Sequence, residues 1–153
     1  MADLEIERDD RFVANERRTH RVAVAMMALV VLCGALGVFG FGPLASATRR
    51  GAGVAVTYER FGRNGAPLRL TVDRTRPGPL RVWVSDALLE ATRLDTVVPT
   101  PAGEQRTAAG ATFSFEESDT AAFELTGNDV GLVRGRVGRS PTDAVPITIL
   151  LYP

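Results

Sequence analysis

The sequence predicts a mainly β protein, in which one N-terminal transmembrane helix precedes an antiparallel, immunoglobulin-like β-sandwich of about seven to eight strands with one short helix. Three observations support this fold class. Residues 22–44 contain no charged side chain. After residue 50, apolar and polar side chains alternate with the period of two that is typical of half-buried strands. Turn-forming residues then recur every 8 to 12 residues or so, as they do in sandwich domains.

The uncharged segment has the length and composition of a membrane-spanning helix. At about 1.5 Å per residue, a helix over residues 22–44 reaches roughly 34 Å, compared with a hydrocarbon core of about 30 Å. Leu, Val and Phe, which favour insertion, make up about half of it. Ala45-Ser46-Ala47 has the small-x-small form of a signal-peptidase site, so cleavage remains an alternative, but the long apolar run favours a retained anchor.

This anchor divides the chain into four parts. We expect a charged cytoplasmic juxtamembrane tail over residues 1–21, the transmembrane helix over 22–44, a linker over 45–52 and an extracytoplasmic β-sandwich over 53–153. The two flanks of the anchor carry similar numbers of arginines, so the positive-inside rule decides little. Because a long C-terminal domain translocates regardless of its charge, we expect it outside the cytoplasm, at a bacterial inner membrane.

Eight strands and one helix are predicted in the outer domain. Asn64-Gly65 is expected to form a turn between the first two strands, and Gly127-Asn128-Asp129 a hairpin turn between two later ones. We expect the last strand to complete the core, because its apolar residues alternate up to Leu151. The strands are expected at residues 54–58, 68–72, 80–84, 94–98, 112–116, 121–126, 132–137 and 145–152, and the helix at residues 86–92.

The composition excludes several classes of function. All 18 basic residues are arginines and are balanced by 18 acidic residues, so the chain is no polycation and nucleic-acid binding is not expected. Beyond residue 44 there is no histidine, cysteine or lysine. This removes histidine-based triads, thiol nucleophiles, Schiff-base lysines and nitrogen or sulfur metal sites from that region. We therefore expect a non-enzymatic protein without a cofactor or a metal.

Carboxylates are the remaining catalytic side chains. Glu116, Glu117 and Asp119 cluster near a turn, where solvated acidic residues are expected, and their spacing matches no calcium loop. The alternative is an enzyme acting on envelope glycans with a carboxylate pair such as Glu116 and Glu124. Glycines surround the segment at residues 131–138, which we interpret as a strand with a bulge or close backbone approach and not as a phosphate loop.

Two sets of residues are candidates for binding. Strand alternation places Trp83 on the same face as Arg81 and Arg69, and Trp and Arg are common interface anchors. Arg134 and Arg136 occupy the polar face of a later strand. The alternative is that the helix at residues 86–92 folds back and covers the tryptophan. Within the membrane, four small residues are candidates for helix packing: Cys33, Gly34, Gly37 and Gly40.

Several segments carry a family resemblance. The sequences at residues 56–63 (VTYERFGR), 80–101, 132–138 (LVRGRVG) and the terminal LLYP resemble those of small uncharacterised bacterial single-pass inner-membrane proteins with a β-rich extracytoplasmic domain. The resemblance implies an inner-membrane protein that serves as an accessory to another membrane protein. It implies no activity and no catalytic residue.

From these observations we expect a membrane-anchored, non-enzymatic binding, accessory or scaffold module outside the cytoplasm. Its expected partners are the lipid bilayer and another integral membrane protein. Two alternatives remain open. One is the carboxylate-dependent glycan enzyme, and the other is a single-pass signalling protein that transmits an outer event to its charged tail.

Overall fold

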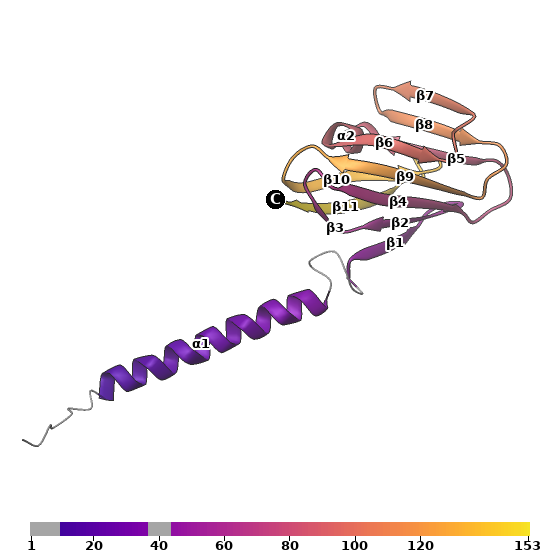
Figure 1. The fold of residues 1–153 in the computed structure, drawn as a ribbon. Coiled ribbons are helices and arrows are strands. Elements are labelled where there is room, and N and C mark those ends of the chain that lie inside the picture. Colours follow the sequence, from indigo (N-terminus) through magenta and orange to yellow (C-terminus); the bar gives the residue numbers. More distant parts are fainter. Residues whose placement is uncertain (1–9, 37–43) are drawn as a thin grey trace, which may run out of the picture.

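The computed structural model describes residues 10–36 and 44–153 of the chain, which form one long helix followed by a mainly β domain (Figure 1). Helix α1 (Asp10–Ala35) begins before the predicted start at residue 22 and ends before residue 44, with Leu36 in a turn. Residues 37–43 of the predicted span lie outside the described residues. Within the described part of the chain, one helical segment, Glu16–Ala35, is long and apolar enough to cross a membrane.

The β domain consists of two sheets. The five-stranded sheet has the order β1 (Ser46–Arg50), β2 (Val54–Glu59), β4 (Pro67–Arg74), β9 (Thr120–Gly127) and β6 (Thr92–Val98). The six-stranded sheet has the order β3 (Phe61–Arg63), β11 (Val145–Tyr152), β10 (Gly131–Gly138), β5 (Leu80–Ser85), β8 (Gly110–Phe115) and β7 (Gly103–Thr107). Neighbouring strands are antiparallel except β3 and β11, which run parallel.

All eight predicted strands are present, and the structure adds β1, β3 and β7. The prediction of a linker over residues 45–52 is wrong in its central part, because Ser46–Arg50 is β1 and pairs with β2 along its whole length. This strand has no apolar alternation, and its side chains are mostly exposed. It forms because the edge of β2 offers backbone hydrogen-bonding groups, a signal that the local sequence does not carry.

Turn residues identify chain reversals correctly but not the strands that they join. Asn64 and Gly65 form the predicted turn, in which Gly65 has a φ of 76°. The prediction that Gly127-Asn128-Asp129 closes a hairpin is wrong, because β9 and β10 belong to different sheets. The same residues therefore carry the chain from one sheet to the other.

The core lies between the two sheets. Alternate residues of each strand face inward, so that Val56, Leu70 and Phe123 from one sheet meet Val82 and Phe113 from the other in one buried cluster. The ring of Phe123 packs edge-on against those of Phe113 and Phe115, at centroid distances of 5.4 and 6.4 Å.

Helix α2 (Asp86–Ala91) directly follows β5 and packs against β5, β6, β8 and β10. Its Leu88 side chain is fully buried in the core. The hydroxyl of Thr92 donates a hydrogen bond of 2.7 Å to the Leu88 carbonyl, which satisfies a buried polar group where the helix ends.

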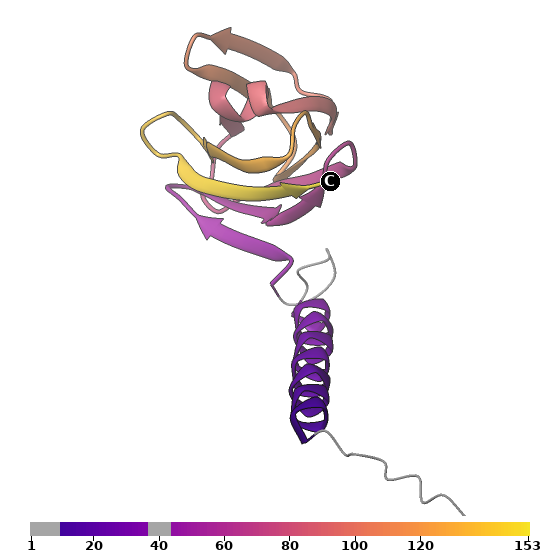
Figure 2. The ribbon, with the colours of Figure 1, turned by 90° about the vertical axis from the view of Figure 1, so that its left-hand side faces the viewer.

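The chain enters the β domain at one edge of both sheets. The Arg60 amide donates a hydrogen bond of 2.7 Å to the carbonyl of Ala45, just before β1, and β2 leads through Arg60 into β3. Strands β1 and β3 are edge strands, and β6 and β7 are the edges at the other side of their sheets. Figures 1 and 2 show β1 at the bottom of the domain and β7 at the top. We call the β6–β7 side distal, since it lies across both sheets from the point where the chain enters.

Candidate functional site

The distal side holds a groove between the edges of the two sheets. It has a volume of about 370 Å³, and we call it the distal groove. Its apolar surface comes mainly from the half-buried Leu89 of α2 and Leu94 of β6, since Ala111 and Phe113 of β8 are each 1% exposed. The other residues that line it are Thr92, Arg93, Glu104, Arg106 and Asn128. The groove thus combines core side chains with polar and charged groups of both signs.

The apolar side of the groove reaches the core directly. Phe113 is 1% exposed, and it also packs against Phe123. Leu89, Leu94 and Phe113 in addition line a small apolar void of about 10 Å³ under α2, which is at the lower limit for holding a water molecule. A ligand seated in the groove would therefore lie against the well-packed part of the molecule.

Asp95 follows Arg93 and Leu94, the residues of β6 that line the groove. The register of β6 against β9 shifts between Leu94 and Thr96, which makes Asp95 the extra residue of a bulge. The Asp95 carboxylate accepts hydrogen bonds from the hydroxyl of Thr126 and, at 2.6 Å, from Nε of Arg93. The hydrogen bond from Thr126 makes the largest contribution to lowering the pKa of Asp95 below its ordinary value, and the hydrogen bond from Arg93 lowers it as well.

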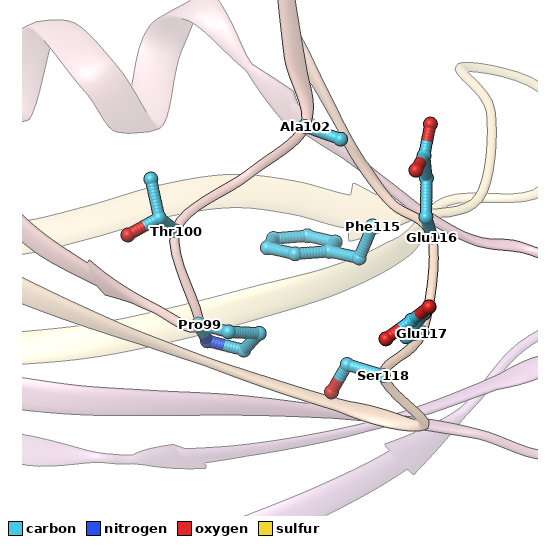
Figure 3. A pocket seen from close by; sticks show the side chains of 7 residues that line it. All are labelled: Pro99, Thr100, Ala102, Phe115, Glu116, Glu117 and Ser118. Atoms are coloured by element: carbon cyan, nitrogen blue, oxygen red, sulfur yellow. The ribbon is translucent and has the colours of Figure 1, made fainter.

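A second hollow, of about 520 Å³, lies beyond the end of β6, and we call it the Pro99 hollow. Figure 3 shows the ring of Phe115 between the segment that carries Pro99 and Thr100 and the segment that carries Glu116 and Glu117. The two carboxyl groups point in different directions, so they do not converge on one point in the hollow.

The other predicted carboxylates are paired elsewhere. Asp119 forms an ion pair with Arg74. Glu124 lies on the outer face of β9, with one carboxylate oxygen 3.7 Å from the Arg69 guanidinium. Glu116 follows β8 in the other sheet. The structure therefore does not bring Glu116 and Glu124 to one cleft. Within the described ranges, no cluster of three His, Cys, Asp or Glu side chains could hold a metal ion.

The predicted surface around Trp83 is not formed. Trp83 is 6% exposed, so the tryptophan is covered, as in the alternative, and offers no binding surface. Arg81 shares the outer face of β5 with Trp83 as predicted, but Arg69 lies in the other sheet, so the prediction is wrong for Arg69. Leu88 of α2 joins the core cluster on the Val84 side of β5, which is the face opposite to that of Trp83.

Arg134 and Arg136 lie as predicted on the exposed face of β10. The Arg136 guanidinium donates a hydrogen bond of 3.2 Å to the Ala144 carbonyl, and Arg134 stands opposite Thr148 of β11. The glycines of this strand allow close packing, as predicted. A Cβ at Gly135 would lie 2.7 Å from Leu88, and one at Gly138 would lie 2.5 Å from Ala144.

Sequence reasoning missed a group of exposed apolar side chains on the same face. Leu132 of β10 and Leu150 of β11 are direct cross-strand partners and are 53% and 41% exposed, and the adjacent Val130 is 47% exposed. A signal was present in the sequence, because Leu132 and Leu150 are apolar residues at positions where the strand alternation calls for polar ones.

The predicted packing residues of the membrane helix are only partly described. Cys33 and Gly34 lie near the end of α1 and are half-buried. Gly37 and Gly40 lie outside the described residues. Helix packing through these residues stays a prediction.

Comparison with known proteins gives little further information. No protein-family model and no curated protein matches the sequence. Among solved structures, a mutant β-glucosidase from Listeria innocua in complex with laminaribiose has a TM-score of 0.35 and 13% identity. The same enzyme in complex with isofagomine has a TM-score of 0.33 and 15% identity. They match 74% and 73% of this chain, which spans about 17% of the length of those structures.

Proposed function

We propose that this chain is a membrane-anchored, non-enzymatic binding module that presents the distal groove to a polypeptide segment of another membrane protein. The N-terminal tail is in the cytoplasm of a bacterial cell, and the β domain, an immunoglobulin-like sandwich, is outside it. The apolar helix supports the anchor, and the groove supports the binding function.

Exposure of the apolar side chains along α1 supports its role as an anchor. Residues of this helix such as Met27 and Val31 are 70% and 67% exposed, and none of the apolar window is buried against the protein. Lipid is the environment in which such a helix is stable. The place of Ala45-Ser46-Ala47 in the fold supports retention of the anchor. Ala45 is buried, and cleavage after Ala47 would remove two of the five residues that pair β1 with β2.

The distal groove is the observation on which the proposed binding function depends. Its lining places Leu94 and Phe113 beside Arg93, Glu104 and Arg106. A buried apolar contact surrounded by polar groups is the usual organisation of a protein interface. Side chains of both charge signs suit a polypeptide, which carries both signs, better than a uniformly anionic ligand.

The sheet edges beside the groove limit the mode of binding. Strand β6 pairs with β9 and strand β7 with β8, so each has one free edge within the described structure. The bulge at Asp95 interrupts the edge of β6, and Glu104 and Arg106 place charges on β7, which are features that block continuous strand addition. We therefore expect a partner to be held mainly through its side chains.

Site-specific photocrosslinking in native membranes tests the proposal. A photoreactive amino acid at Arg106 or Glu104 should give a discrete adduct with one membrane protein. The same residue at Arg76, which is exposed in the connection between β4 and β5, is the matched control and should give none. Recovery of uncrosslinked protein from both groove positions, or identical adducts at Arg76, would contradict the proposal.

A further inference from the structure

The outer face of the six-stranded sheet carries an apolar patch at the edge where the chain enters the domain. Leu132, Leu150 and Phe61 lie in register across β10, β11 and β3, and Val130 precedes β10. Tyr152, at the end of β11, is half-buried. Together these five residues form what we call the apolar patch. Lone exposed apolar side chains are common in proteins, but adjacent ones in register across three strands indicate a contact surface.

The apolar patch adjoins the point at which the chain arrives from α1. The Ala45 carbonyl accepts the amide of Arg60, and the Arg60 carbonyl accepts the amide of Leu150 at 2.8 Å. Ten residues, 36–45, separate the end of α1 from β1. A fully extended chain of that length spans at most about 33–36 Å, so the patch is held close to the membrane that contains α1.

Arginines accompany the apolar side chains. The Arg60 guanidinium lies 5.8 Å from the centre of the Phe61 ring. Arg63 and Arg134 are exposed on the strands that carry the patch. Two acidic residues are also close to the patch: Glu90 lines one hollow with Val130, Leu132 and Arg134, and the Asp129 carboxylate accepts the amide of Val130 at 2.7 Å. Glu59 lies on the outer face of the other sheet. Three arginines and two acidic residues therefore surround the patch.

We propose that the apolar patch docks on the surface of an anionic lipid bilayer, the one that holds α1. Leucine, phenylalanine and tyrosine side chains partition into the headgroup region, and guanidinium groups bind lipid phosphates. The inference rests on the proposed function for its anchor. It adds an orientation to that function. The patch is on the outer face of the six-stranded sheet, whereas Glu104 and Arg106 of the distal groove stand opposite the core-facing Phe113 and Ala111 on its inner side, so the docked domain turns the groove away from the bilayer.

Fluorescence quenching by nitroxide-labelled lipids tests this docking on the full chain. Cys33 is the only cysteine, so C33S allows single-cysteine labelling with the fluorophore NBD. The probe is placed at L132C in the patch, at R106C beside the distal groove, or at M27C in α1. The protein is reconstituted into vesicles of phosphatidylethanolamine and phosphatidylglycerol that contain headgroup-labelled or acyl-labelled nitroxide lipids.

Docking predicts strong quenching of the L132C probe by headgroup nitroxides and little quenching of the R106C probe. With V130C as a second patch reporter, Arg134→Gln should reduce the ratio of docked to free domain about fivefold, as expected for losing one basic contact with an anionic surface. Arg106→Gln is the matched control and should leave the ratio unchanged. Replacing phosphatidylglycerol by phosphatidylcholine should reduce the ratio further than Arg134→Gln does, because it removes the attraction of all the arginines at the patch.

Equal quenching at L132C and R106C would overturn the inference. So would a blue-shifted but unquenched L132C probe, since that result would place protein rather than lipid on the patch. The M27C probe separates this failure from failure of the proposed anchor. Quenching of M27C by acyl nitroxides without quenching of L132C rejects the docking alone, whereas an unquenched M27C probe rejects the anchor and with it both proposals.

Discussion

At the scale of single residues, Asp95 shows how side-chain contacts stabilise an irregular strand. Its carboxylate joins Arg93 on its own strand to Thr126 on β9. The pKa of Asp95 is lowered in the folded state, so this group contributes stability above its ordinary pKa of 3.8. That contribution is lost as the pH falls through the lowered pKa of the folded state.

Replacing Thr126 by valine should raise the pKa of Asp95 toward its ordinary value, because the hydroxyl makes the largest contribution to the shift. The titration can be followed by carboxyl-carbon NMR of the full chain in micelles. The control is Thr120→Val, which removes a hydroxyl bonded to Asp73 on another strand pair. An unchanged Asp95 titration in Thr126→Val would show that the hydroxyl does not stabilise the charged carboxylate.

Gly110 is required by both its backbone conformation and its surroundings. Its φ is 150°, and a Cβ at this position would lie 2.1 Å from the Val84 carbonyl oxygen. Gly110→Ala should therefore lower the free energy of unfolding by about 1–3 kcal/mol or more. Gly65→Ala is the control, because Gly65 also has a positive φ, but a Cβ added there would meet no other atom within 4 Å. If chemical denaturation gives both variants a similar loss in the free energy of unfolding, the backbone near Val84 moves to accommodate the added Cβ, which would contradict the prediction.

At the scale of secondary-structure elements, β11 both pairs with two neighbouring strands and contributes side chains to the core. It lies between β3 and β10, and Ile147, Ile149 and Leu151 are at most 2% exposed. Val145, which was also expected in the core, is only partly buried. The strand thus joins the edge where the chain enters to the rest of the six-stranded sheet.

Deleting residues 144–153 should unfold the β domain while leaving membrane insertion intact. Burial of the three side chains contributes roughly 5–9 kcal/mol, comparable with the net stability of a small domain. The measurements are a thermal melt of the truncated chain and its resistance to extraction from membranes by carbonate. Leu150→Ala, at an exposed position of β11, should leave the melting temperature nearly unchanged. A cooperative melt near the full-length midpoint after the deletion would contradict this role of β11.

At the scale of the whole molecule, the two faces of the six-stranded sheet carry different surfaces. The apolar patch lies on the outer face, whereas Glu104 and Arg106 of the distal groove stand opposite the core-facing Phe113 and Ala111 on the inner side. The two surfaces approach each other at Asn128, which lines the groove and also the hollow beside Val130 and Leu132. In the proposed arrangement, the outer face contacts the membrane and the groove is free to bind a partner. The orientation across the membrane then decides which compartment holds that partner.

Protease added to intact spheroplasts should separate the β domain from a tag at the N-terminus. We expect cleavage between α1 and β1, because pairing in the two sheets protects the strands of the β domain and the bilayer protects α1. The tagged fragment should keep the tail and the anchor, and detergent lysis should expose the tail as well. Full protection of the β domain until lysis would place it in the cytoplasm and reverse the proposed orientation.

The sequence by itself determined the apolar helix, the eight principal strands, α2 and the inward side of most strands. Each of these depends on local periodicity or on a local helix start. Residues such as Ile147 and Ile149 alternate with exposed neighbours because only one side of the strand is buried. The sequence also placed Arg134 and Arg136 correctly on an exposed face.

Only the tertiary structure decided which strands share a sheet and which faces meet. A period of two assigns a residue to one of the two faces of its own strand, but it does not say which other strands extend that face. Arg69 and Arg81 therefore lie in different sheets, and Trp83 is buried although its strand position is on the outer side. The polar strands β1 and β7 form because backbone groups of neighbouring strands are available for pairing. The distal groove exists because two sheet edges that are distant along the chain meet there, a juxtaposition that no local pattern encodes.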